Sequence, residues 1–485
     1  MHGFTPCPRL GKAVKPAYLD RREKTACMIR QPVAHRILLC FTILALAGCN
    51  QDAPSLRARF RHYNLLLISI DTLRADYVGA YGKKNKTPVI DSLAGRGFLF
   101  ESMFTTSSTT LPAHLSLMTS LYPRDCRNGY AVQESVTTLA EVLSRNGYTC
   151  LAAVSALPLD PRFNIQQGFS FYDADFSSCR GSVNLKDRKW FDHGYGVFDC
   201  NAEETTRRAI AALEKQKPEA PFFMWVHYYD AHLPYGPPAG FYDPGKVART
   251  DFPYFLKPGQ SDRESLQELY SGEIRFVDAQ VEKLLEGVGR LYDAQQTIIV
   301  LVADHGENLY EHDGYLDHSR VVYDTVMWIP CIMYLPGFPG KRIAELASII
   351  DVMPTLLDLL EIETKGCEGI SLAGLMEAAG PAPVRSYVTC ETNDFGVKDE
   401  DQAIAVRTVN SKYIYNNWKS GQDLFFNMQE MPRERRPVAD DDAIKNELAG
   451  YYQEWRKQYK SGNLALQQQL DTKTEDALKS LGYLQ

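Results

Sequence analysis

Carboxylates and imidazoles follow three apolar runs of this chain, at the point where each run ends. The runs and the polar residues after them are residues 65–70 with Asp71, residues 221–227 with Asp230 and His232, and residues 297–303 with Asp304 and His305. A buried carboxylate must be paired or bound to a metal. Aspartate together with histidine suits a divalent cation of borderline hardness, so this pattern predicts a site for Ca²⁺, Mn²⁺ or Zn²⁺.

Thr110 is the candidate nucleophile, because it stands where a helix is expected to begin. Pro112 suits a first helical turn, and a helix N-terminus favours negative charge. A hydroxyl bound to a cation in that place can ionise and attack. The residues alone leave a plainer alternative open, in which Thr110 and Asp71 are ordinary helix N-caps.

Further imidazoles and one carboxylate could complete the site. Asp230 and His232 would point the same way in an extended chain, since side chains alternate with period two. His318 lies in a glycine-containing loop after Asp304, where it could bind the anionic group of a substrate or a second metal. We assign Asp230 and His114 to a second metal or to substrate binding, and we interpret His312 as a solvated loop histidine.

The apolar runs are nearly continuous, which is typical of strands buried on both faces of a parallel sheet. Helical spacing at residues 137–145, 203–214 and 264–291 lies between them. This alternation predicts an α/β fold, with a large, mixed, mostly parallel sheet sandwiched by helices. Because ligands bind at the carboxyl ends of parallel strands, the three polar clusters should meet at one edge of the sheet.

Composition divides the chain into five expected parts. They are a leader and lipoprotein signal at 1–48, a polar tether at 49–61, a catalytic domain at 62–365, a small C-terminal α+β subdomain with an antiparallel sheet at 366–437, and a helical tail at 438–485. Short alternating segments at 403–407 and 413–416 indicate the antiparallel sheet.

The first 48 residues have the pattern of an export signal. A charged start precedes the apolar run 37–47, which is too short to span a bilayer, and Gly48 precedes Cys49. Leu-Ala-Gly-Cys at 46–49 resembles the bacterial lipobox. We therefore expect a protein of the bacterial cell envelope, lipid-anchored to the membrane at Cys49 and facing the periplasm. An ordinary signal peptide is the alternative, and translation starts at Met1 or Met28.

Charge and cysteine content exclude some classes. The 485 residues carry a net charge of -7, which does not suit a nucleic-acid-binding surface. No CxxC pair occurs among the 11 cysteines, so a zinc ribbon is not expected. Export permits disulfides, and we expect Cys179 to pair with Cys200 across a polar loop. Cys150 and Cys331 fit buried apolar thiols.

Several motifs, in a consistent order, resemble the sulfatase family of the alkaline phosphatase superfamily. They are IDTLRAD at 70–76, GAYG at 79–82, TPVIDSLA at 87–94, TLPAH at 110–114, PFF at 221–223, HLPY at 232–235, DHGE at 304–307, residues 351–357 and LGYL at 481–484. The resemblance implies an alkaline-phosphatase-like fold with Asp71, Thr110, Asp304 and His305 around one metal. It also implies that His232 and His318 lie near the ester as catalytic residues, where either could bind a non-bridging oxygen or protonate the leaving group.

The sequence departs from that family where sulfate is cleaved. Thr110 replaces the cysteine or serine that matures to formylglycine, His114 replaces the signature arginine, and Thr72 replaces a tandem aspartate. A threonine sulfate lacks the second hydroxyl through which formylglycine eliminates sulfate, whereas water can attack a phosphothreonine at phosphorus. Three hypotheses follow: a phosphate or phosphonate ester hydrolase or phosphoryl transferase, a sulfatase without formylglycine, and an inactive binding lipoprotein.

Overall fold

The structure, a computed structural model, describes Leu56 and residues 59–458 apart from 83, 129–130, 178, 180–198, 217–218, 253–255, 313, 378–383, 393–401, 417–419, 430–433, 435–436 and 438–441. The predicted leader, Cys49 and most of the tether lie outside the described residues, as do residues 459–485 of the predicted helical tail.

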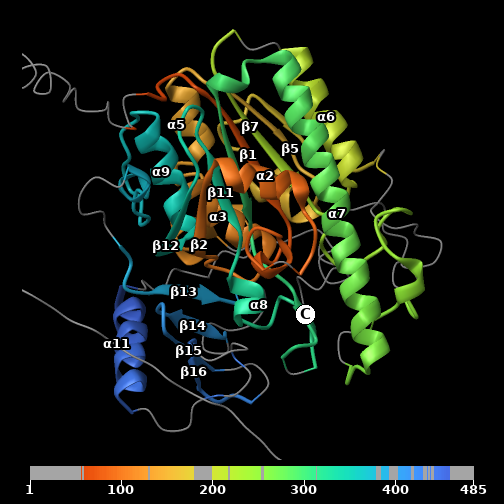
Figure 1. Cartoon of the computed structure of the whole chain (residues 1–485). Helices are drawn as coiled ribbons and strands as arrows, with labels where there is room; N and C mark the ends of the chain where they lie inside the picture. The colour runs from red at the N-terminus through yellow and green to blue at the C-terminus, as the bar shows by residue number, and fades with distance from the viewer. Residues whose placement is uncertain are drawn as a thin grey trace, which may run out of the picture. The chain divides into compact units, whose positions relative to one another are not determined.

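A large sheet forms the centre of the fold (Figure 1). Among the described residues it has eight strands in the order β12-β2-β11-β8-β1-β7-β5-β6. Their bounds are β1 Asn64–Ile70, β2 Phe98–Phe104, β5 Thr149–Ala153, β6 Phe171–Asp173, β7 Phe222–Tyr228, β8 Thr297–Ala303, β11 Cys331–Tyr334 and β12 Lys341–Ser348. β11 runs antiparallel to both neighbours and the other pairs are parallel. The predicted mixed, mostly parallel sheet is confirmed.

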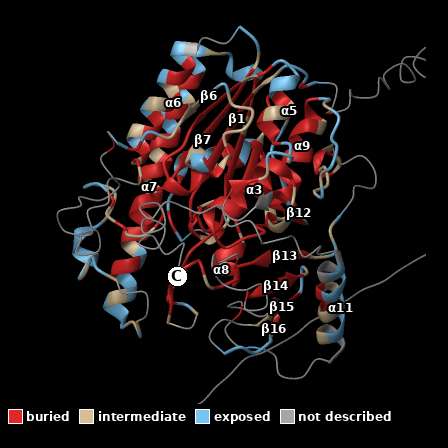
Figure 2. Cartoon of the chain, turned by 180° about the vertical axis from the view of Figure 1, so that it is seen from behind, coloured by how far each residue is buried: buried red, intermediate tan, exposed pale blue. Residues whose placement is uncertain are grey.

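The three predicted apolar runs form the middle of this sheet. β1 lies between β7 and β8, so Leu67 pairs with Trp225 on one side and with Val300 on the other. These strands are buried along almost their whole length, whereas the helices α5 (Leu139–Arg145) and α6 (Ala202–Gln216) are exposed on their outer sides (Figure 2). Continuous apolar sequence is therefore the local cause of the central strands.

Two layers of helices cover the sheet. In one layer, α2 (Pro88–Arg96) and α6 both contact α7 (Gln260–Leu291). In the other layer, α3 (Thr110–Thr119) contacts α5 and α9 (Val352–Leu359), and α9 contacts α10 (Ala373–Glu377). The predicted helices at 137–145, 203–214 and 264–291 are confirmed as α5, α6 and α7. α5 begins at a capping box of Thr138 and Glu141.

A second, antiparallel sheet follows in the order β13-β14-β15-β16, with α11 against β14 and β15. The bounds are β13 Val388–Glu391, β14 Ile404–Arg407, β15 Ser411–Tyr415, β16 Leu424–Asn427 and α11 Asp442–Gln458. The shorter elements are α4 Pro123–Cys126, α8 Asp324–Met327, β3 Arg127–Asn128, β4 Ala131–Val132, β9 Asn308–Leu309, β10 Leu316–Asp317, and the 3-10 turns η2 Ala75–Tyr77, η3 Leu157–Leu159, η4 Pro161–Phe163, η6 Pro244–Lys246, η7 Ala294–Gln296 and η8 Ile349–Asp351.

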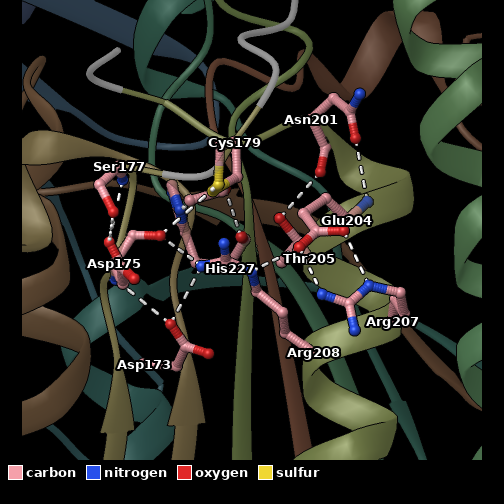
Figure 3. The surroundings of a disulfide bond; sticks show 12 residues. Asp173, Asp175, Ser177, Cys179, Asn201, Glu204, Thr205, Arg207, Arg208 and His227 are labelled. Carbon is pink, nitrogen blue, oxygen red and sulfur yellow. Dashed lines mark hydrogen bonds and ion pairs between the residues drawn. A yellow bond between two sulfur atoms is a disulfide. The ribbon is translucent and has the colours of Figure 1, made fainter. Parts of the chain in front are cut away.

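The predicted disulfide between Cys179 and Cys200 is present. Figure 3 shows it beside the turn that Asp175 and Ser177 make after β6, close to the start of α6. Cys150 and Cys331 are buried free thiols, as predicted. No described helix combines the length and apolar character that crossing a membrane requires.

Candidate active site

Strand pairing brings two of the predicted ligands together. Ile70 pairs with Ala303 at the ends of β1 and β8, so the next residues, Asp71 and Asp304, emerge side by side. Carboxylate and imidazole atoms of Asp71, Asp304 and His305 lie within 4.8 Å of one another, and all three side chains are buried. This part of the predicted constellation therefore meets in space.

Thr110 is the first residue of α3 and points its hydroxyl into this cluster. Its Oγ1 donates to Asp71 Oδ2 at 3.2 Å and lies 3.4 Å from His305 Nε2. The four residues Asp71, Thr110, Asp304 and His305 are called the Asp71 cluster below. Because Thr110 also stands at a helix N-terminus, negative charge on its oxygen is favoured there.

The helix-cap interpretations of Thr110 and Asp71 are wrong. The N-cap of α3 is Thr109, which makes no side-chain cap hydrogen bond, and the hydroxyl of Thr110 is directed at Asp71 instead. Asp71 is followed by the 3-10 turn η2, whose N-cap is Arg74. Neither polar side chain is used to cap a helix, so both are available for other chemistry.

The Asp71 cluster has the electrostatics of a cation site. Asp304 Oδ1 accepts from the backbone amides of Thr72 and His305, but Asp304 Oδ2 and Asp71 Oδ1 are buried without a hydrogen-bond partner. Burial raises the pKa of both carboxyls, and for Asp304 the neighbouring Asp71 adds to the rise. In the described part of the chain, the basic side chains at salt-bridge distance from these two carboxylates are histidine rings alone.

His305 is oriented as a metal ligand. Its Nδ1 lies 3.0 Å from the carbonyl oxygen of Gly306, so Nδ1 carries the hydrogen and Nε2 carries a lone pair. That Nε2 is 3.4 Å from Asp304 Oδ2 and 3.7 Å from Asp71 Oδ1. Burial lowers the pKa of His305 well below its usual value, which keeps the ring neutral. The donors present therefore fit a divalent cation.

Gly306 allows the chain to turn directly after these ligands. Its amide donates to the carbonyl of Val326 at 2.7 Å, and a Cβ at this position would lie only 2.2 Å from the carbonyl oxygen of Thr325. The close approach of two backbones, rather than an unusual φ, requires glycine here.

His114 anchors the backbone of the nucleophile. Its Nδ1 lies 2.8 Å from the carbonyl oxygen of Thr110, so that nitrogen donates. Its Nε2 then accepts from Ser69 Oγ at 3.0 Å, and Ser69 Oγ in turn accepts from Trp225 Nε1 at 2.9 Å. Burial lowers the pKa of His114 to about 3, with the adjacent His227 contributing, so the ring stays neutral. One fixed chain of hydrogen bonds thus runs from Trp225 to Thr110.

His232 and His318 meet, but Asp230 diverges from them. A turn follows β7, in which the amide of His232 donates to the carbonyl of Tyr229, so the chain is not extended there. His232 Nε2 reaches His318 Nε2 at 3.1 Å, whereas the buried Asp230 accepts from the backbone amide of Ala202 at the start of α6. The shared direction expected for Asp230 and His232 is therefore wrong.

The structure corrects the interpretation of His312 and adds two residues, Glu307 and Asp317, to which the sequence analysis gave no role. His312 stacks on Tyr323 and is mostly buried, so it is not a solvated loop histidine. Glu307 and Asp317 join His318 in a second buried group. The dipeptide Asp317-His318 repeats the order of Asp304-His305, and this repetition was the sequence signal for it.

Comparison with known proteins identifies relatives of this chain. A family model described as Sulfatase matches residues 63–362. The arylsulfatase of Clostridium perfringens is 24% identical over 454 residues, covering 79% of this chain and 92% of the relative. The multifunctional alkaline phosphatase superfamily protein PehA of Trinickia caryophylli is 24% identical over 494 residues, covering 81% of this chain and 95% of the relative.

Solved structures share the fold. A phosphonate monoester hydrolase from Silicibacter pomeroyi superposes with a TM-score of 0.65 at 22% identity, over 83% of this chain and 96% of that one. A protein in complex with its substrate D-glucosamine-2-N,6-O-disulfate superposes with a TM-score of 0.67 at 17% identity, over 83% and 99% of the two chains.

Proposed function

The chain belongs to the sulfatase family of the alkaline phosphatase superfamily, and from this membership we propose that it hydrolyses phosphate or phosphonate esters with Thr110 as the nucleophile. Hydrolysis of a sulfate or phosphate ester is what its relatives establish. The nucleophile, the cation and the preference for phosphorus are the proposal.

One observation carries this proposal: the hydroxyl of Thr110 points between Asp71 and His305 instead of capping its own helix. Asp71 Oδ2 accepts the hydrogen bond from Thr110 Oγ1 and is placed to take its proton as the oxygen attacks. The start of α3 stabilises the charge that develops on that oxygen. The hydrogen-bond chain through His114 holds the threonine backbone during the attack.

The Asp71 cluster would hold the divalent cation through Asp71, Asp304, His305 and Thr110. The bound cation would lower the pKa of the hydroxyl and neutralise charge on the ester oxygens. All-oxygen sites favour Ca²⁺, whereas the imidazole of His305 favours Mn²⁺ or Zn²⁺.

Threonine chemistry favours phosphorus over sulfur. An ester formed on Thr110 has no second hydroxyl on the same carbon, so it cannot eliminate its acid group. Water must attack that group directly, which phosphoryl chemistry allows. The relatives of this chain include enzymes for both kinds of ester. One sequence relative is an arylsulfatase, and one structural neighbour is a phosphonate monoester hydrolase.

Turnover of matched aryl esters tests the proposal. Chelator-treated protein is assayed on aryl phosphate, aryl phosphonate and aryl sulfate, with Ca²⁺, Mn²⁺ or Zn²⁺ added back. We expect Thr110→Ala to abolish turnover and Thr109→Ala, the neighbouring threonine on the same helix start, to retain it. Equal activity in Thr110→Ala would remove the nucleophile.

The remaining outcomes choose among the other hypotheses. Faster turnover of aryl sulfate than of both phosphorus esters would make the protein a sulfatase that works without formylglycine. No bound metal and no turnover of any ester would leave a binding protein with the same fold.

We also propose that the protein is exported to the bacterial cell envelope, faces the periplasm and is anchored in the membrane through a lipid on Cys49. The lipobox-like residues 46–49 after an apolar run support this. Cys49→Ser should move the protein from the membrane fraction to the soluble fraction and prevent labelling by radioactive palmitate. Cys40→Ser, within the apolar run, should change neither result.

A further inference from the structure

Four charged side chains lie buried between α8 and the antiparallel sheet β13–β16, called the small sheet below. The cations are Lys412 of β15 and Arg407 of β14, and the carboxylates are Asp324, at the start of α8, and Glu434. Lys412 Nζ lies 3.1 Å from Asp324 Oδ1 and 2.6 Å from Glu434 Oε1. Arg407 Nε donates to both carboxylate oxygens of Asp324 at 3.2 Å. These four residues are called the Lys412 cluster.

The Lys412 cluster also holds backbone at the edge of the large sheet. The amide of Asp324 donates to Glu434 Oε2 at 2.7 Å, so Glu434 binds both the start of α8 and Lys412. The guanidinium of Arg407 lies over the ring of Phe104, 4.4 Å from its centroid, and Phe104 is the last residue of β2. The cluster therefore connects two strands of the small sheet to α8 and to the end of β2.

Buried charges of this kind restrict geometry more than they add stability. Replacing a buried ion pair as a whole by apolar side chains is often neutral or stabilising, whereas removing one partner is strongly destabilising. The side chain of Lys412 is 0% exposed, so water cannot replace a lost carboxylate. The start of α8 must therefore stay where Asp324 and Glu434 both reach Lys412.

α8 carries backbone acceptors for two segments of the candidate active site. The carbonyl of Val326 accepts at 2.7 Å from the amide of Gly306, the residue that follows the ligand His305. The carbonyl of Met327 accepts at 2.9 Å from the amide of Thr105. Thr105 begins the segment that leads from β2 into α3, whose first residue is the proposed nucleophile. Movement of α8 would therefore be transmitted to both segments.

The small sheet also pairs directly with the segment before α3. The amide of Glu391, at the end of β13, donates to the carbonyl of Thr106 at 3.0 Å. The amide of Ser108 donates to the carbonyl of Glu391 at 3.1 Å. The small sheet therefore supports the approach to the nucleophile by strand pairing, and it supports the turn after His305 through α8.

We propose that Lys412 is a positioning residue for the reaction. By holding Asp324 and Glu434 it fixes α8, and α8 fixes the turn after His305 and the segment that leads to Thr110. This inference rests on the proposed function for its kinetic consequence. Its structural consequence, a fixed backbone at Gly306 and Thr105, is measured without any activity.

A double variant that leaves the net charge unchanged tests the proposal. Lys412→Met with Glu434→Gln removes one positive and one negative charge, and glutamine keeps an oxygen that accepts from the amide of Asp324. The free energy of unfolding should change little, because the two charges are removed together. Hydrogen exchange, followed by mass spectrometry on peptides that contain Gly306 and Thr105, should become about 10-fold faster at these two amides.

The same double variant should lose rate rather than substrate affinity. A displacement of about 1 Å at the nucleophile reduces rate by up to about 100-fold, so kcat on 4-nitrophenyl phosphate should fall by about 10- to 100-fold. KM should stay within about twofold of the wild-type value, because the small sheet acts on the position of the nucleophile.

Tyr413→Phe is the matched control. Tyr413 follows Lys412 on β15, and its hydroxyl donates to Asp423 Oδ2 at 2.6 Å. Since side chains alternate along a strand, its ring lies on the opposite face from Lys412 and contacts Tyr452 of α11. This variant loses a hydrogen bond of the small sheet without touching α8. It should keep the wild-type kcat and the wild-type exchange at both amides.

The outcomes separate this proposal from the proposed function. If the double variant does not fold, as judged by circular dichroism, Glu434→Gln alone replaces it and should also show faster exchange at Gly306 and Thr105. Wild-type exchange at both amides in a folded variant would overturn the proposal, as would faster exchange with an unchanged kcat. Faster exchange in a protein whose wild type hydrolyses no ester would support the control of these two segments by Lys412 while removing the proposed function.

Discussion

Replacing Ser69 with alanine tests how the nucleophile is held in place. The substitution leaves Trp225 Nε1–H and His114 Nε2 without their partner inside the core. Each buried polar group left unsatisfied costs about 1–3 kcal/mol, so the free energy of unfolding should fall by about 2–6 kcal/mol. The ring of His114 then loses one of the two hydrogen bonds that hold it, so its hydrogen bond to the carbonyl of Thr110 weakens.

The catalytic effect follows from the geometry. A displacement of about 1 Å at the nucleophile reduces rate by up to about 100-fold. Because Ser69 has no contact with the substrate in this scheme, kcat should fall by about 10- to 100-fold while KM changes little. Steady-state kinetics on 4-nitrophenyl phosphate and urea unfolding of the same preparations measure the two effects.

Ser116→Ala is the matched control. Ser116 is also buried, on the same helix α3, and its hydroxyl bonds to Thr106 and to the carbonyl of Leu121 without reaching Thr110. It should lose similar stability and keep kcat. Equal kcat values for the Ser69 and Ser116 variants would refute the positioning role of the hydrogen-bond chain.

Three further predictions concern stability. Burial raises the pKa of Asp230 to about 7. The buried charge therefore destabilises the folded protein above that pH, and this effect disappears below the pKa of about 4 that the carboxyl has in the unfolded chain. Asp230→Asn should stabilise the protein at pH 8 and not at pH 4, measured by urea unfolding. Replacing Cys179 and Cys200 with serine opens a loop with a sequence separation of 21 and should reduce stability by about 3 kcal/mol against the oxidised wild type, and dithiothreitol-treated wild type should match the variant. Gly306→Ala forces its Cβ against the carbonyl oxygen of Thr325 and should yield little folded protein by circular dichroism, unlike alanine at the open position Gly289.

Much of the fold could be predicted from local sequence. The central strands are continuous apolar runs because they are buried on both faces, and α7 shows its helical period because one side packs on α2 and α6. The loop closed by Cys179 and Cys200 was also predictable, since export permits disulfides and the loop between them is polar.

The site was predictable only as a set of candidates. Asp71, Asp304 and His305 follow neighbouring parallel strands, so their meeting follows from the strand order. Asp230 was misplaced because the chain turns after β7, and the turn sends Asp230 to α6 and His232 to His318. The sequence contains no signal for the geometry of that turn.

The sequence by itself determined which segments are buried and which polar residues stand at the ends of strands, because burial is recorded in the local pattern of apolar residues. Only the tertiary structure decided which polar atoms face one another. The hydroxyl of Thr110 on Asp71, the paired imidazoles of His232 and His318, and the unpartnered oxygen of Glu307 each depend on turns and on contacts between residues far apart in the chain. Such contacts are set by the packing of whole elements, and no local pattern records them.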